Sequence, residues 1–257
     1  MEKYEHNNHF KIKYCEVDFK DEIKLSALLA YLEEVSCSSA DELGFGYEYV
    51  KARNYAFFVS GYRCDFIKPI RLGQTICVTT WPTPPKHVIF GREYQIRSVE
   101  KEILLNATSR WCLMDMQSGK ILPSKLIDNQ DYSSYNTTKL FPEWRWKIPT
   151  FSTSEGILKF SITIANSEYD HNMHVNNTRY ADYCLNCFGV AELQEKKLKS
   201  FAILYIKQCK EGETLHFYRK FVGEDEYLVH GFNECGEVVV QSQICFEKNN
   251  GTNEKCQ

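Results

Sequence analysis

Residues 66–75 read FIKPIRLGQT, and residues 205–214 read YIKQCKEGET. Both stretches open with an aromatic residue, isoleucine and lysine, and both close with a glycine and a threonine, at an offset of 139 (205 − 66). Apolar residues followed by a glycine turn and a β-branched residue are typical of strand, tight turn and strand. The recurrence predicts that the chain contains one structural unit twice.

A second pair of stretches lies upstream of the first. Glu16-Val17-Asp18 precedes one helical segment, and Glu168-Tyr169-Asp170 precedes another, at an offset of 152 (168 − 16). The first copy therefore carries 13 more residues than the second (152 − 139), and they fall around residues 44–47. The order of the matching stretches is the same in both copies, as a duplication requires.

Each copy contains a helical pattern followed by alternating strand patterns. In the first, apolar residues from Leu25 to Leu43 recur at helical spacing and Gly44 provides a stop, so we expect a helix over 25–43. In the second, a stripe from Tyr180 to Ala191 predicts one helix, with Asn176 or Asn177 as its N-cap. A single helix can bury its stripe only against the face of an antiparallel sheet. The prediction is an α+β fold of two tandem domains, 1–123 and 151–257, joined by a polar linker over 124–150.

Composition excludes several classes of protein. The 257 residues are 25% charged with a formal net charge of −3, which lacks the basic excess of a dedicated nucleic-acid binder. No run of about 18 apolar residues predicts a membrane span. The N-terminus resembles neither a secretory signal nor a transit peptide. The 11 cysteines are odd in number and irregularly spaced, which favours free thiols and a cytoplasmic protein.

The densest chemistry is the stretch DHNMHVNN at residues 170–177, between a strand and the second helix. If the segment is extended, Asp170, Asn172 and His174 lie on one side of it. The helix N-terminus behind them offers a positive dipole end to a developing oxyanion. An ordinary polar turn that caps a helix is the alternative interpretation. The first copy has Asp18, Lys20 and Glu22 at the matching positions, so only the second copy carries acid, amide and imidazole together.

The run from Asp170 to Tyr180 resembles the D-x-N-x-H-V-N-N-x-x-Y motif of the acyl-acyl carrier protein thioesterases of bacteria and plant plastids. The resemblance extends over roughly residues 8–247. It implies two hot-dog domains in one chain, each with a sheet wrapped around a long helix. It also implies a hydrolase of fatty acid biosynthesis that cleaves the thioester between a fatty acyl chain and the phosphopantetheine of acyl carrier protein. By the same resemblance there is no metal or organic cofactor, and the chain is expected to be a bacterial member.

The resemblance also assigns roles to residues. Asp170, Asn172 and His174 take the catalytic positions. The family places a carboxylate before a cysteine on a strand of the second domain, and the matching pair is Gln208 and Cys209. Glutamine cannot accept a proton as a carboxylate does, which is the main departure from the pattern. The positions expected to bind substrate are Asn176 and Asn177, with Leu32, Ser36, Ser39 and Phe58 of the first domain shaping an acyl-chain pocket.

The sequence leaves the mechanism open. Water activated by Asp170 or His174, Asp170 itself through an anhydride, and a Cys209 thiolate with His174 as base are all candidate attacking groups. An acyl-CoA thioesterase, or a non-catalytic acyl-carrier or lipid-binding protein, remains the alternative function. Cys184-x-x-Cys187 lies on the apolar stripe of the second helix and favours core packing over a metal site. A homodimer is compatible with the sequence.

Overall fold

The computed structural model describes residues 3–127 and 132–248 of the chain. The first half contains β1 (His6–Lys11), α1 (Leu25–Glu42), α2 (Tyr47–Lys51), β2 (Tyr55–Phe66), β3 (Thr75–Lys86), β4 (Ile89–Ser98), β5 (Ile103–Asp115) and β6 (Ile121–Leu122). The second half contains β7 (Ile157–Thr163), α3 (Asn177–Leu185), α4 (Val190–Gln194), β8 (Lys196–Tyr205), β9 (Thr214–Gly223), β10 (Glu226–Phe232) and β11 (Val238–Lys248). Short 3-10 helices occur at Tyr14–Glu16, Ser124–Leu126, Tyr132–Ser134, Thr153–Glu155 and Asn166–Glu168.

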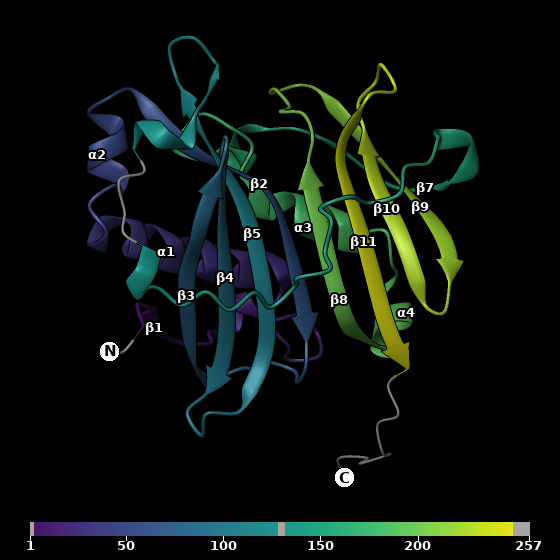
Figure 1. Cartoon of the computed structure of the whole chain (residues 1–257). Helices are drawn as coiled ribbons and strands as arrows, with labels where there is room; N and C mark the ends of the chain where they lie inside the picture. Colours follow the sequence, from purple (N-terminus) through teal and green to yellow (C-terminus); the bar gives the residue numbers. More distant parts are fainter. Residues whose placement is uncertain (1–2, 128–131, 249–257) are drawn as a thin grey trace.

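The described strands form one antiparallel sheet in the order β1-β3-β4-β5-β2-β8-β11-β10-β9-β7, with β6 paired to β5. The halves join where β2 pairs with β8, from Gly61 opposite Leu204 to Asp65 opposite Ser200. Helices α1 and α3 lie on the same face of this sheet, α1 behind the first half and α3 behind the second (Figure 1). Each half therefore wraps its strands around a helix, as the sequence predicts.

The repeated stretch that defines the two copies forms the same structure twice. β2 ends at Phe66 and β3 begins at Thr75, while β8 ends at Tyr205 and β9 begins at Thr214. Gly73 and Gly212 have positive φ angles of 75° and 85°, a region that glycine enters without the steric cost of a Cβ. The glycine at the matching place in each copy is therefore required by the turn.

The two helices differ in continuity. α1 runs unbroken for 18 residues, and Leu28, Leu29 and Leu32 are fully buried, each contributing roughly 1.5–3 kcal/mol. The prediction of one helix over the stripe from Tyr180 to Ala191 was wrong, because α3 ends at Leu185 and α4 begins at Val190. Gly189 interrupts the helix with an extended backbone (φ −73°, ψ 156°). The stripe is buried before the break, where Cys184 and Cys187 are 0% and 3% exposed, and it is exposed after it, where Val190 is 57% exposed.

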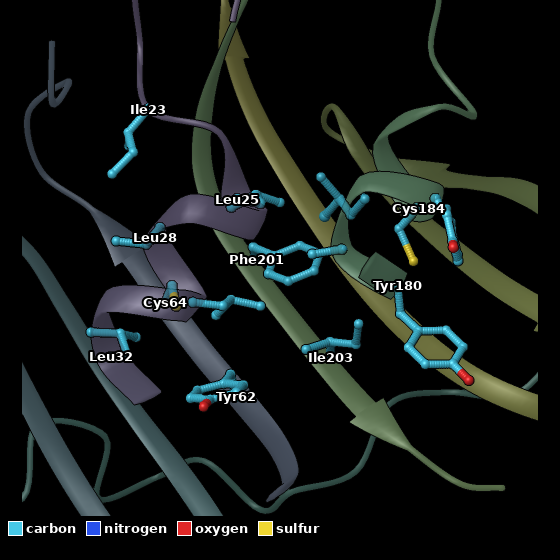
Figure 2. Close-up of a cluster of buried hydrophobic side chains, with 14 of the residues drawn as sticks. Ile23, Leu25, Leu28, Leu32, Tyr62, Cys64, Tyr180, Cys184, Phe201 and Ile203 are labelled. Atoms are coloured by element: carbon cyan, nitrogen blue, oxygen red, sulfur yellow. The ribbon is translucent and has the colours of Figure 1, made fainter. Parts of the chain in front are cut away.

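Both helices contribute to one apolar core that crosses the boundary between the halves. Leu25, Leu28 and Leu32 of α1 share a cluster with Tyr62 and Cys64 of β2. The same cluster contains Phe201 and Ile203 of β8 and Tyr180 and Cys184 of α3, and Figure 2 shows these side chains converging between the two helices and the sheet. The core that supports the second-half turn is thus built by residues of both halves.

The polar segment between the halves crosses the sheet face opposite to the helices (Figure 1). Trp81 Nε1 donates to the carbonyl of Thr138 (2.9 Å), and the Leu140 amide donates to Glu93 Oε2 (3.2 Å). The guanidinium of Arg63 lies 5.1 Å from the ring centre of Trp144. These contacts hold the described part of the segment against the surface.

Candidate active site

Asp170 closes a tight turn immediately before α3. Its Oδ1 accepts hydrogen bonds from the backbone amides of Asn172 (2.8 Å) and His174 (3.2 Å). The Asp170 amide in turn donates to the carbonyl of His174 (2.8 Å), and Met173 adopts a φ of 59°. The segment is therefore a turn and not the extended stretch that the spacing suggested. One carboxylate oxygen satisfies two amides, which an extended backbone would leave to solvent.

Helix α3 starts directly behind this turn. Asn176 is its N-cap, and the Asn176 side chain accepts hydrogen bonds from the amide (2.9 Å) and the hydroxyl (2.8 Å) of Thr178. This confirms the capping prediction for Asn176 and places Asn177 as the first helical residue. The positive end of the α3 dipole consequently points toward the turn that carries Asn172 and His174.

The first half contains the same turn with different side chains. Asp18 Oδ1 accepts from the amides of Lys20 (2.8 Å) and Glu22 (3.2 Å), and Asp21 has a φ of 57°. The backbone therefore matches the second-half turn at the predicted offset of 152. What separates the two turns is the pair Asn172 and His174 in one and Lys20 and Glu22 in the other.

The second-half turn faces residues of the first half. The His174 ring lies 4.6 Å from the ring of Phe58 on β2, and the His171 ring lies 5.7 Å from Tyr47 on α2. Burial lowers the pKa of His174, although the nearby charge of Asp170 opposes this shift. A lowered pKa leaves the imidazole neutral at pH 7, so it can accept a proton. Of the residues expected to bind substrate, Phe58 is the one in ring contact with His174.

A second carboxylate approaches from α1. Asn177 Nδ2 donates to Glu33 Oε2 (3.2 Å), and the Tyr205 hydroxyl donates to the carbonyl of Asn177 (3.0 Å). Burial raises the pKa of Glu33, with Asp170 adding to the shift and His171 opposing it. Sequence reasoning missed Glu33. The feature of the sequence that could have indicated it is a glutamate placed among positions 29, 32 and 36 of the helix, which are buried.

Gln208 and Cys209 lie in the loop that follows β8, and they face different environments. Gln208 is exposed, and no hydrogen bond joins it to Asp170, Asn172 or His174 within the described parts of the chain. Cys209 is 0% exposed. Burial raises the pKa of its thiol, although a hydrogen bond with Tyr180 opposes the shift. The sulfur is therefore a protonated thiol at neutral pH.

Three of the first-half positions expected to bind the acyl chain, Leu32, Ser36 and Ser39, lie on α1. Ser36 lines a small cavity of about 70 Å³, together with Cys37, Ala40, Phe45, Phe57, Phe90 and Trp111. Ser39 is buried and accepts a hydrogen bond from Arg92 (2.9 Å), while Leu32 is fully buried in the shared core. Ser36 is the one of these predicted residues that lines the cavity, and an acyl-chain pocket in this half stays a prediction.

A larger cavity of about 540 Å³ lies beside the other turn. It is lined by Asp18, Lys20 and Glu22 together with Leu185 of α3 and Lys197 of β8. This crevice repeats the arrangement around His174 with the roles of the halves exchanged, since each combines a turn of one half with a helix and a strand of the other. The two crevices differ in side chains as well as in volume, because the amide and imidazole of Asn172 and His174 occur only at the second-half turn.

Neither a metal cluster nor a membrane helix occurs in the described residues. No group of three or more His, Cys, Asp or Glu side chains is placed to hold an ion within 3–127 and 132–248. Over the same ranges, no helix has the length and apolar composition needed to span a bilayer. The ten cysteines found there are free, and Cys256 lies outside the described residues.

Comparison with solved structures identifies the fold. An acyl-ACP thioesterase from Bacteroides thetaiotaomicron superposes with a TM-score of 0.85 at 22% identity, over 95% of this chain and 98% of that one. The 12:0-ACP thioesterase from Umbellularia californica gives a TM-score of 0.82 at 17% identity, over 95% and 98%. The architecture is therefore the α+β tandem hot-dog fold that the sequence predicts.

Sequence comparison gives the family. A palmitoyl-acyl carrier protein thioesterase, chloroplastic, from Gossypium hirsutum is 24% identical over 221 residues, which cover 81% of this chain and 53% of that protein. The chain thus spans about half the length of the curated relatives it matches. The model of the acyl-ACP thioesterase N-terminal domain matches residues 3–126, and that of the C-terminal domain matches residues 155–248. On these two matches, the chain belongs to the acyl-ACP thioesterase family.

Proposed function

We propose that this chain hydrolyses the thioester of fatty acyl-acyl carrier protein, releasing free fatty acid and so ending chain elongation. The observation that carries the proposal is the second-half turn, which contains Asn172 and brings His174 against Phe58 of the first half, in a chain of this family. The first-half turn has the same backbone and lacks both side chains. The chemistry is therefore assigned to one of the two crevices.

The turn supplies the groups that thioester hydrolysis needs. Asn172 orients the acyl carbonyl by hydrogen bonding, and the N-terminus of α3 stabilises negative charge that develops on the carbonyl oxygen. A water oxygen bonds to the carbonyl carbon, the carbon–sulfur bond breaks, and the water loses a proton. The neutral His174 takes up this proton and passes it to the departing thiolate, while Asp170 fixes the turn through its two amide bonds.

Attack by water is favoured over attack by Cys209. The buried sulfur has a raised pKa, whereas a nucleophilic cysteine needs a lowered one. The acyl chain is assigned to the first half, where the apolar cavity lined by Ser36, Ala40 and Phe57 runs beside α1. Substrate would thus contact both halves, with the thioester at the turn and the chain along α1.

A direct assay tests the proposal. Purified protein is incubated with a panel of acyl-acyl carrier proteins and acyl-CoAs of different chain lengths, and free fatty acid is quantified. Release from the carrier substrates by the native chain, with a loss of about 10²–10⁴-fold in kcat for His174→Ala, is the expected result. Turnover of acyl-CoA in preference to carrier substrates would make the chain an acyl-CoA thioesterase. No release from any thioester would leave a binding protein.

A further inference from the structure

A polar cluster is buried at the junction of the two halves, next to the second-half turn. Its centre is the Glu33 carboxylate of α1, which accepts a hydrogen bond from Asn177 at the start of α3 (3.2 Å). Tyr62 projects from β2 into the shared core with 0% exposure (Figure 2). The Tyr205 hydroxyl donates to the carbonyl of Asn177 (3.0 Å), and burial, with the charge of Glu33 as a further cause, raises the pKa of Tyr62 and Tyr205.

Two polar atoms of this cluster are available to a substrate or a water molecule. Asn177 Oδ1 and the Tyr62 hydroxyl are buried and have no hydrogen-bond partner among the described residues. A buried polar atom left without a partner costs about 1–3 kcal/mol. Native structures retain such groups mostly where they serve function or hold water.

The pseudo-symmetry of the chain sets Glu33 apart. The offset of 152 pairs Glu33 with Leu185 (33 + 152), the last residue of α3, which lines the crevice beside the Asp18 turn. At the position that matches Glu33, α3 therefore has an apolar side chain, and the carboxylate that α3 brings to this crevice, Asp182, is held by hydrogen bonds with Ser26. The crevice that receives Glu33 is the one that carries Asn172 and His174.

The other carboxyl-type groups near the turn are poorly placed to take a proton from water. Gln208 is an exposed amide. Oδ1 of Asp170 already accepts hydrogen bonds from two backbone amides. Glu33 uses Oε2 for Asn177, and no hydrogen bond to Oε1 is formed by the described residues.

We propose that Glu33, contributed by the first half, is the general base of the reaction, taking the proton from the attacking water in place of the carboxylate that position 208 lacks. This inference rests on the proposed thioester hydrolysis. The water oxygen forms a bond to the carbonyl carbon as its proton passes to Glu33, and the carbon–sulfur bond breaks. Glu33 releases this proton to His174, which passes it to the departing thiolate, so that Glu33 ends as a carboxylate and His174 as a neutral imidazole.

The surroundings of Glu33 suit this role. Burial raises the pKa of its carboxyl, so the carboxylate is a stronger base than an exposed glutamate. The charged and titratable groups around it are Asp170 and His171 of the turn, Glu34 of its own helix, and the phenols of Tyr62 and Tyr205. Asn177 holds the side chain in one orientation, which a positioned base requires.

Replacing Glu33 by glutamine tests the proposal with little structural change. Glu33→Gln keeps the length of the side chain and an oxygen to accept the Asn177 hydrogen bond, and it removes only the basic group. We expect kcat on acyl-acyl carrier protein to fall by about 10²–10⁴-fold with KM nearly unchanged. The acid limb that Glu33 contributes to the pH profile of kcat/KM should also disappear. Glu34→Gln, one residue along on the exposed side of α1, is the matched control and should retain native turnover.

A second variant guards against a simple loss of structure. Glu33→Ala leaves a space that formate can enter, so added formate should restore part of the lost turnover while formamide should not. An active native chain, an inactive His174→Ala variant, and Glu33→Gln within a few-fold of native with the same pH profile would overturn this inference and leave the proposed hydrolysis standing. A native chain that hydrolyses no thioester would instead overturn the proposed function, and this inference with it.

Discussion

At the scale of single residues, Asp18 and Asp170 show how a carboxylate can be structural and functional at once. Each accepts two backbone amides at the same distances, 2.8 Å and 3.2 Å. Turn formation alone therefore explains an aspartate at both positions. The chemistry of the second turn comes from the residues two and four places later, Asn172 and His174, and from what the other half brings to them.

The sequence predicted part of this residue set and could not predict the rest. Asp170, Asn172 and His174 stand out because the repeat supplies an internal comparison with Asp18, Lys20 and Glu22. Glu33 does not stand out, because its neighbourhood depends on how α1 meets a segment 144 residues away. The spacing of apolar residues predicts which face of a helix a residue lies on, but it does not predict which other element packs against that face.

Cys209 provides a prediction about the attacking group. The thiol is fully buried with a raised pKa, so removing it should leave hydrolysis within a few-fold of native. The appropriate variant is Cys209→Ala, which adds no new polar group to the core, and the measurement is kcat with an acyl-acyl carrier protein. Loss of a true nucleophile lowers kcat by several orders of magnitude, and such a loss in a folded variant would restore the thiolate mechanism.

At the scale of elements, boundaries that follow strand and turn chemistry were predictable. The end of β2 and the start of β3 coincide with the quoted stretch at 66–75, and those of β8 and β9 with its copy at 205–214. The helix of the second half was not fully predictable, because the apolar pattern of its stripe continues past the break at Gly189 into the exposed residues Val190 and Ala191. An apolar period in the sequence does not by itself show where the buried helix ends.

The outer face of the second-half sheet contains a buried histidine with a predictable effect on stability. His230 of β10 is 0% exposed and stacks on Phe151 of the preceding segment, with ring centres 4.2 Å apart. Burial lowers its pKa from 6.5 to about 4, and neither ring nitrogen has a hydrogen-bond partner among the described residues. As the pH falls below 6.5, His230 therefore takes up a proton in the unfolded chain, whereas in the folded chain it does so only near pH 4.

His230→Phe removes this proton linkage. Stability contributed by the neutral ring is complete above the unfolded pKa and is lost as the pH falls toward the folded one. The native chain should therefore lose about 2 kcal/mol more than the variant between pH 7 and pH 5. Urea unfolding of both proteins at a series of pH values measures the difference. Parallel pH dependences would show that His230 is protonated equally in both states.

At the scale of the whole molecule, the two halves are one structure. They share a continuous sheet through β2 and β8 and one apolar core, so neither half encloses its own helix alone. The duplication creates two crevices between the halves, and substitutions within the repeat have made them unlike. One crevice has Asn172, His174 and Glu33, and the other has Lys20, Glu22 and Leu185.

The joint between the halves can be tested at Gly61. A Cβ added there would lie 2.6 Å from the carbonyl oxygen of Ile203, a backbone atom of the partner strand. Gly61→Ala should therefore lower the free energy of unfolding by about 1–3 kcal/mol. Because both halves depend on the joint, unfolding should remain one transition by circular dichroism and by tryptophan fluorescence.

Gly91→Ala on β4 is the matched control for this effect. Its added Cβ would meet a side-chain hydroxyl, that of Thr83 at 2.5 Å, which can rotate away. A smaller loss of stability than in Gly61→Ala is expected. Two separated transitions in Gly61→Ala would show that the halves fold independently, against the shared-core description.

The central claim is that one of two matching turns performs chemistry, and a pair of matched variants tests it most directly. His174→Gln and Glu22→Gln change the same position of the two turns (22 + 152 = 174) and leave Asp170 and Asp18 to accept their two amides, so both turns should persist. Fatty-acid release from acyl-acyl carrier protein is then measured for both variants beside the native chain. The account predicts a loss of at least about 100-fold for His174→Gln and native turnover for Glu22→Gln. Equal activity of the two variants would contradict it.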